Sequence, residues 1–136
     1  MYFALIPDDK TKADLVALVQ DPPEEFHLTL LFSPDRETRI PPEEVEALER
    51  EARLPSRAVV VGLYNFGPEG KKVWSLRLAC WANLRTLCKQ LLAKHNIPWD
   101  KTWLFNPHVT IGKKASITLL GALPEALTFD RIELRY

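Results

Sequence analysis

Residues 26–32 read Phe-His-Leu-Thr-Leu-Leu-Phe, and residues 107–112 read Pro-His-Val-Thr-Ile-Gly. Both stretches contain the frame histidine, apolar residue, threonine, apolar residue, which starts at His27 and again at His108. Side chains of an extended strand alternate between two faces, so each histidine shares a face with the threonine two positions later. Each stretch is therefore predicted to be a strand that buries one side and presents an imidazole and a hydroxyl on the other.

The rest of the chain alternates predicted strands and helices. Apolar alternation and β-branched runs predict strands over residues 2–6, 26–32, 57–66, 72–78, 108–113 and 127–136. Apolar residues at helical spacing predict helices over residues 10–20, 42–53 and 82–94. The first of these helices is predicted from apolar residues at Ala13, Val16, Ala17 and Val19, and the strand over 57–66 is expected to be buried. The fold class expected from this order is α+β.

Length and composition favour one globular domain. The 136 residues are 46% hydrophobic and 26% charged, so we expect a single domain over residues 1–136. The two motifs lie in separate parts of the chain, which indicates two lobes that share a cleft. The net charge is zero, so long duplex nucleic acid is not expected as a partner, and a small nucleotide or short RNA end fits better. With no leader or apolar run of membrane-spanning length, a cytoplasmic monomer without a membrane partner is expected.

Other candidate site residues have structural interpretations. Cys80 and Cys88 have no metal-binding spacing, and Cys88 falls on the apolar stripe of the helix over 82–94, so it is predicted to lie in the core. His95 follows the same helix, where a basic group suits the negative helix end. We expect neither a metal site nor a cofactor.

Two imidazoles on opposite sides of a phosphorus atom can cleave a phosphodiester. One enters neutral and removes a proton from the nucleophile, and the other enters protonated and gives a proton to the leaving oxygen. An unperturbed histidine pKa of about 6.5 allows both states near neutral pH. Hydroxyls of Thr29 and Thr110 can donate hydrogen bonds to the phosphate oxygens as charge builds on them.

The paired frame and the order of elements resemble the 2H phosphoesterase superfamily, which includes 2′–5′ RNA ligase-like enzymes and cyclic phosphodiesterases. The resemblance implies a two-lobed fold in which antiparallel sheets line a central cleft and helices lie outside. It also implies metal-independent catalysis by His27 and His108, with Thr29 and Thr110 on the phosphate. Many relatives carry a basic residue three positions after the second threonine, which is Lys113 here. Strict alternation points Lys113 away from His108, so a solvated lysine remains an alternative.

The substrate expected from the resemblance is a 2′,3′-cyclic phosphate, a 2′–5′ linkage or a cyclic oligonucleotide. Residues 22–30 look similar to small phage-encoded members, some of which degrade or sequester cyclic oligonucleotide signals in the host cytoplasm. Base stacking is assigned to Trp103, Phe105 and Trp74, with core packing as the alternative for each. A non-catalytic module that binds a phosphorylated ligand and a purely structural domain remain open as other functions.

Overall fold

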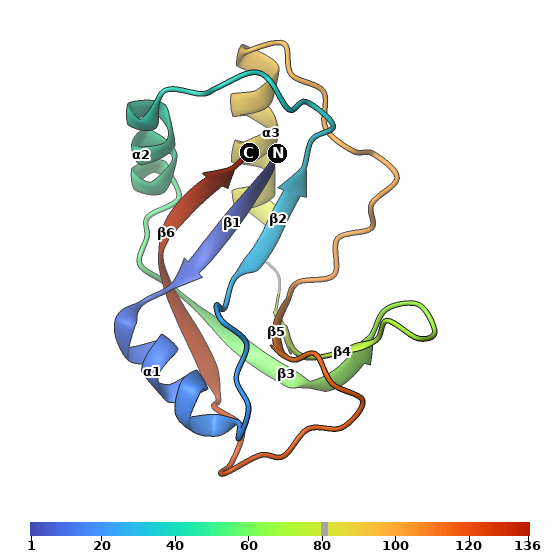
Figure 1. The fold of residues 1–136 in the computed structure, drawn as a ribbon. Helices are drawn as coiled ribbons and strands as arrows, with labels where there is room; N and C mark the ends of the chain where they lie inside the picture. Colours follow the sequence, from blue (N-terminus) through green and yellow to red (C-terminus); the bar gives the residue numbers. More distant parts are fainter. Residues whose placement is uncertain (80–81) are drawn as a thin grey trace.

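The computed structural model describes residues 1–79 and 82–136, which form six strands and three helices (Figure 1). Every predicted strand and helix is present, with ends within two residues of those expected. In chain order they are β1 (Tyr2–Pro7), α1 (Asp9–Leu18), β2 (Leu28–Phe32), α2 (Pro42–Glu51), β3 (Ser56–Phe66), β4 (Val73–Leu78), α3 (Ala82–Lys94), β5 (His108–Gly112) and β6 (Ala126–Arg135). Cys80 lies outside the described residues.

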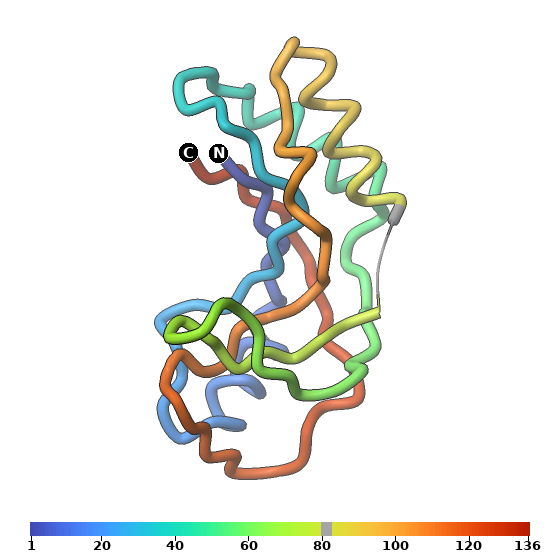
Figure 2. Tube along the Cα trace, turned by 90° about the vertical axis from the view of Figure 1, so that its right-hand side faces the viewer, coloured from blue at the N-terminus to red at the C-terminus, as the bar shows by residue number. Residues whose placement is uncertain are grey.

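All strand pairs are antiparallel, and the strands form one sheet in the order β2-β1-β6-β3-β4-β5. Residues 56–59 of β3 pair with β6, and residues 60–66 pair with β4, so β3 joins the two halves of the sheet. The motif strands β2 and β5 are the outermost strands of this order, yet they contact each other. The sheet is therefore strongly curled, and Figure 2 shows its trace bending around an open side.

The helices lie outside the curl, which confirms the expected α+β class. α2 contacts β6, α3 contacts β2, and α1 contacts both β1 and β6. In Figure 1 α3 lies behind β1 and β2, and Figure 2 shows it on the side away from the concave face. Within the described residues, no helix has the length and apolar character needed to cross a membrane.

The apolar side of each motif strand is buried as predicted. Leu28 and Leu30 of β2, and Val109 and Ile111 of β5, are all 0% exposed. Thr29 of β2, and His108 and Thr110 of β5, alternate with them and are only partly buried, whereas Leu31 is fully buried beside a register shift in the pairing of β1 with β2. Because burial of a leucine or isoleucine stabilises the fold by about 1.5–3 kcal/mol, these residues determine which face of each strand is turned inward.

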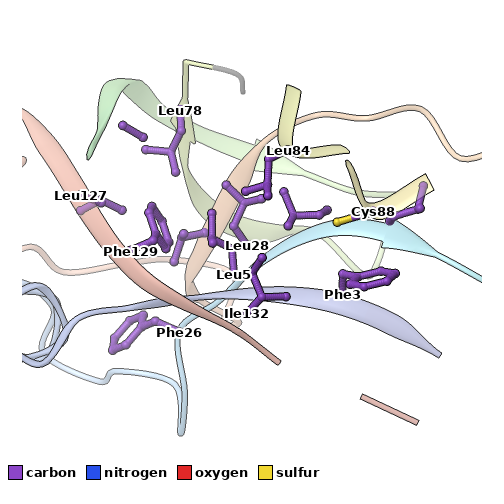
Figure 3. Packing of buried hydrophobic residues seen from close by; sticks show 14 of the residues in the cluster. Phe3, Leu5, Phe26, Leu28, Leu78, Leu84, Cys88, Leu127, Phe129 and Ile132 are labelled. Atoms are coloured by element: carbon purple, nitrogen blue, oxygen red, sulfur yellow. The ribbon is translucent and has the colours of Figure 1, made fainter. Parts of the chain in front are cut away.

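Helix α3 supplies the other side of this core. Leu84, Cys88 and Leu92 lie at i, i+4 and i+8 and are almost fully buried. Figure 3 shows Leu84 beside Leu28 and Leu5, which lie on β2 and β1. The prediction for Cys88 is confirmed, and burial raises the pKa of its thiol to about 12. A thiol with so high a pKa is unreactive at neutral pH.

Burial differs in two places from what the sequence indicates. In α1 the buried residues are Thr11, Leu15 and Leu18, whereas Val16 is 46% exposed; of the four apolar residues that predicted the helix, Val19 is buried, at the C-cap. Leu15 and Leu18 are the two largest side chains spaced at i, i+3, and they outweigh the smaller alanines and valines in choosing the inner face. The strand over 57–66 is also not buried throughout, because Val59 and Val61 of β3 are more than half exposed. Only alternate residues of that strand face the core.

His95 has the structural role expected, although it contacts a glutamate of another helix and not the carbonyl end of its own helix. Its Nε2 lies 2.9 Å from Oε2 of Glu44, in the first turn of α2. Lys94 also pairs with the Glu44 carboxylate. The end of α3 is thereby joined to the start of α2, away from the motif strands.

Candidate functional site

The four motif side chains lie where β2 and β5 come together. His108 and Thr110 stand on one face of β5, opposite its buried face, and both are partly exposed. Thr29 lies on the corresponding face of β2, and His27 immediately precedes that strand. The two strands contact each other, and the charge of His108 acts on His27, so the two histidines lie near one another, with Thr29 and Thr110 on the strands that begin there.

The ring of His108 is held by main-chain atoms. Its Nδ1 lies 2.5 Å from the carbonyl oxygen of Asn106, and a carbonyl can only accept, so Nδ1 carries the hydrogen. Nε2 is then the ring nitrogen that can exchange a proton with a substrate. The carbonyl of Pro107 accepts from the N–H of Leu78 at 3.0 Å, which fixes the segment leading into β5. The Phe66 ring lies 5.0 Å from the His108 ring and limits its movement.

The ring of His27 is held by an acidic side chain. Its Nδ1 lies 3.2 Å from Oε1 of Glu25, two positions earlier, which is an ion-pair contact. Arg135, near the end of β6, donates to the same Glu25 carboxylate and also reaches Glu133 at 3.2 Å. The Tyr2 ring lies 5.8 Å from the His27 ring. As with His108, this arrangement leaves Nε2 of His27 for a substrate.

The charges around His27 favour its neutral form. Burial lowers the pKa of His27, and the negative charge of Glu25 opposes this only in part. The positive charges of Arg135, His108 and Lys113 lower that pKa further. The hydrogen bond from Arg135 lowers the pKa of Glu25, so its carboxylate stays ionised at neutral pH. The charges of His108 and Lys113 therefore act on His27, although Lys113 also lines a separate pocket with Asp21 and Lys114.

Two residues of β4 complete the face that carries His108. Ser75 pairs with Thr110 and Arg77 pairs with His108, so these side chains share one face of the sheet. Ser75 is fully buried, and its Oγ lies 3.4 Å from Oγ1 of Thr110, which limits the directions the threonine hydroxyl can take. The guanidinium of Arg77 lies over the Tyr64 ring at 5.6 Å and adds a positive charge beside His108.

The predicted stacking residues separate into two places. Trp103 meets Phe32, the last residue of β2, edge to face at 4.8 Å, and lies 6.0 Å from Phe105. Arg85 covers the Phe105 ring at 4.4 Å and donates to the carbonyl of Leu30 at 2.9 Å. These two candidates therefore lie beside the end of β2.

Trp74 lies elsewhere, at the start of β4. Its indole N–H donates to the carbonyl of Ala115 at 3.3 Å, and its Cβ lies beside Gly112. Its ring is thus fixed to the loop that follows β5. Among the described residues, no cluster of three or more His, Cys, Asp or Glu side chains is arranged to hold a metal ion.

Sequence reasoning missed four polar residues of the site: Glu25, Ser75, Arg77 and Arg135. One of them had a signal, because Glu25 lies two positions before His27, and the same alternation that pairs His27 with Thr29 puts Glu25 on that face. Ser75 and Arg77 alternate together in the sequence, but only the pairing of β4 with β5 shows which way they point. Arg135 reaches Glu25 across 110 positions, which no local pattern predicts.

Comparison with known proteins gives a family and a fold. A family model described as the 2'-5' RNA ligase superfamily matches residues 9–135. A search of curated proteins gives no match. Among solved structures, the chain is similar to the MHV ns2 PDE domain, with a TM-score of 0.51 and 15% identity over 94% of this chain and 97% of that one. At this identity the likeness shows the fold, whereas the family match spans nearly the whole sequence. The chain therefore belongs to the 2'-5' RNA ligase superfamily, a group of 2H phosphoesterases.

Proposed function

We propose that this chain is a metal-independent phosphodiesterase that cleaves a nucleotide phosphodiester with two histidines as acid and base. Membership in the superfamily supports phosphodiesterase chemistry in general. One observation carries the finer proposal: the Nδ1 of each imidazole faces an oxygen from the residue two positions earlier, through a hydrogen bond to the Asn106 carbonyl for His108 and an ion-pair contact with Glu25 for His27. Both rings therefore offer Nε2, the nitrogen that must move a proton in this chemistry.

The lowered pKa of His27 favours it as the base, which leaves His108 as the acid. Since the pKa of His27 is lowered, its ring is neutral near pH 7 and can accept a proton. Nε2 of His27 takes the proton of the attacking hydroxyl, which is water or a neighbouring ribose hydroxyl, as the new P–O bond forms. Nε2 of His108 gives its proton to the departing oxygen as the old P–O bond breaks. Each transfer contributes about 10²–10⁴-fold to the rate.

The remaining polar groups stabilise the charge on the phosphate oxygens. Thr29 and Thr110 donate hydrogen bonds, and Ser75 positions the hydroxyl of Thr110 from 3.4 Å. Lys113, whose charge already acts on His27 and Glu25, supplies one positive point charge. These bonds strengthen as negative charge develops, so they lower the barrier more than they tighten ground-state binding.

Turnover in the presence of EDTA tests this proposal. The protein is incubated with 2′,3′-cyclic mononucleotides, cyclic di- and trinucleotides, 2′–5′ oligoadenylate and RNA ends that carry a cyclic phosphate, and products are read by mass spectrometry. We expect hydrolysis that EDTA does not abolish, and a loss of about 10²–10⁴-fold in His27→Asn and in His108→Asn. His95→Asn is the matched control, since His95 lies away from the motif strands. Full turnover by either motif variant would refute the mechanism.

The same panel defines the substrate class within the proposal. A 2′,3′-cyclic phosphate, a 2′–5′ linkage and a cyclic oligonucleotide each place one phosphodiester between the two imidazoles. A protein that counters host defence would act first on the cyclic di- and trinucleotides. Tight binding with the ligand recovered unchanged would instead identify a module that sequesters its ligand.

A further inference from the structure

A groove opens beside the end of β2 that lies farther from His27. It has a volume of about 610 Å³, and its aromatic surface comes from Phe32, Trp99 and Trp103. Phe32 and Trp103 meet edge to face, so their rings present surfaces in different directions. The volume lies within the range of about 300–1,000 Å³ that is typical of small-molecule sites.

One ring, that of Tyr2, lies between the groove and the candidate active site. Tyr2 lies 5.8 Å from the His27 ring and 5.7 Å from the Phe32 ring. A row of aromatic side chains thus runs along β2, from His27 at its start to Trp103 beside its end. Consecutive stacked bases need a surface of this kind, because each base presents a flat π-face.

The walls of the groove are fixed by hydrogen bonds that do not involve its rings. The N–H of Asp100 donates to the carbonyl of Phe32 at 2.8 Å, and Oγ of Ser33 donates to the carbonyl of Pro98 at 2.6 Å. The Asp100 carboxylate accepts from the N–H and the hydroxyl of Thr102. A preformed groove binds its ligand without the entropic cost of ordering loops.

Positive charge surrounds the aromatic rings. Nζ of Lys101 lies 5.5 Å from the Trp99 ring and Nζ of Lys89 lies 6.0 Å from it. The guanidinium of Arg85 lies 5.8 Å from the Trp103 ring. The one carboxylate that lines the groove, that of Asp100, is engaged in its own turn. Flat rings bordered by cations match a ligand that is both aromatic and anionic, which is the chemistry of a nucleotide.

We propose that this groove holds a base of an oligonucleotide whose reacting phosphate lies between His27 and His108. The inference rests on the proposed function and adds a substrate class to it. The ligand extends from the reacting phosphate past Tyr2, stacks a base on Phe32, Trp99 and Trp103, and places backbone phosphates near Lys101 and Arg85. A mononucleotide with a 2′,3′-cyclic phosphate reaches the histidines but leaves the groove unfilled.

The test compares a substrate with one base and a substrate with three. Values of kcat/KM are measured for 2′,3′-cyclic AMP and for triadenylates with 2′–5′ and 3′–5′ linkages. Trp99→Leu should lower kcat/KM for whichever triadenylate the wild type hydrolyses about 5- to 150-fold more than it lowers kcat/KM for 2′,3′-cyclic AMP. This difference is the cost of one lost stacked base. Trp99→Phe should restore most of the difference because it keeps an aromatic face. The matched control is Leu104→Ala, in the same loop and 86% exposed.

The outcomes separate this proposal from the proposed function. Equal losses on the one-base and three-base substrates would overturn the groove proposal while leaving the catalytic mechanism intact. If the wild-type protein hydrolyses neither these substrates nor any other of the panel, the mechanism fails; whenever neither of these is hydrolysed, triadenylate binding is measured by calorimetry instead. Binding that weakens in Trp99→Leu and recovers in Trp99→Phe would support the groove even then. Binding that is indifferent to Trp99, or absent, would overturn it.

Discussion

Replacing Glu25 by Gln tests whether a charged partner of His27 contributes to catalysis. Glu25 Oε1 lies 3.2 Å from Nδ1 of His27, and Arg135 keeps the carboxylate ionised. When His27 accepts a proton, the imidazolium that forms is stabilised by this negative charge. Glutamine keeps the size and an acceptor oxygen but removes the charge, so the variant isolates electrostatics from packing.

The expected loss of activity follows from the distance between the charges of Glu25 and His27 and from the exposure of the Glu25 side chain. Two unit charges about 3 Å apart interact by about 1 kcal/mol at the dielectric constant of water. The Glu25 side chain is 51% exposed, so this screened value is more appropriate than that of a buried pair. A loss of about 1 kcal/mol in the transition state lowers kcat/KM about fivefold to tenfold. Because Glu25 raises the pKa of His27, the acidic limb of the pH–rate profile should move to lower pH in the variant.

The assay is kcat/KM between pH 4.5 and 8.5 on the best substrate of the panel, with EDTA present. Glu24→Gln is the matched control, since it removes the same charge from the neighbouring, exposed position. We expect Glu24→Gln to retain the wild-type profile. The reasoning is refuted if both variants lose the same activity, or if the acidic limb of Glu25→Gln moves to higher pH.

Three further predictions concern alternation, pH and the buried thiol. Leu28→Ala should lower the free energy of unfolding, measured with denaturant, by about 2–5 kcal/mol. Thr29→Ala should lower kcat about 10²-fold with little change in stability. If Leu28→Ala instead lost activity and Thr29→Ala lost stability, the assignment of the two faces of β2 would be contradicted. The folded state holds the pKa of His27 below its unfolded value of about 6.5, so lowering the pH below about 6.5 should destabilise the wild type more than His27→Gln, as read by thermal melts. Cys88, whose thiol pKa is about 12, should resist iodoacetamide at pH 8 until the protein unfolds, as peptide mapping would show; modification of the native protein at that residue would place it outside the core.

Elements with strong periodic patterns could be predicted from the sequence. Helix α3 begins and ends at the expected residues because five apolar side chains repeat at helical spacing, and the motif strands follow from strict alternation. The inner face of α1 could not be predicted because its apolar residues are spread around the helix, so only packing against the sheet selects Leu15 and Leu18. The exposure of Val59 and Val61 had the same cause, since β-branched residues favour strands on either face.

The sequence by itself determined the two His-x-Thr faces, because a strand's period of two acts over neighbouring residues and needs no distant contact. It also determined the order of strands and helices and the burial of the apolar residues between His and Thr. Only the tertiary structure decided that β2 and β5 meet, that Ser75 and Arg77 lie beside β5, and that Arg135 holds Glu25. The groove formed by Phe32, Trp99 and Trp103 belongs to this second group as well. These contacts join residues far apart in the chain, and they depend on the pairing register and curl of a sheet that β3 and β6 hold together.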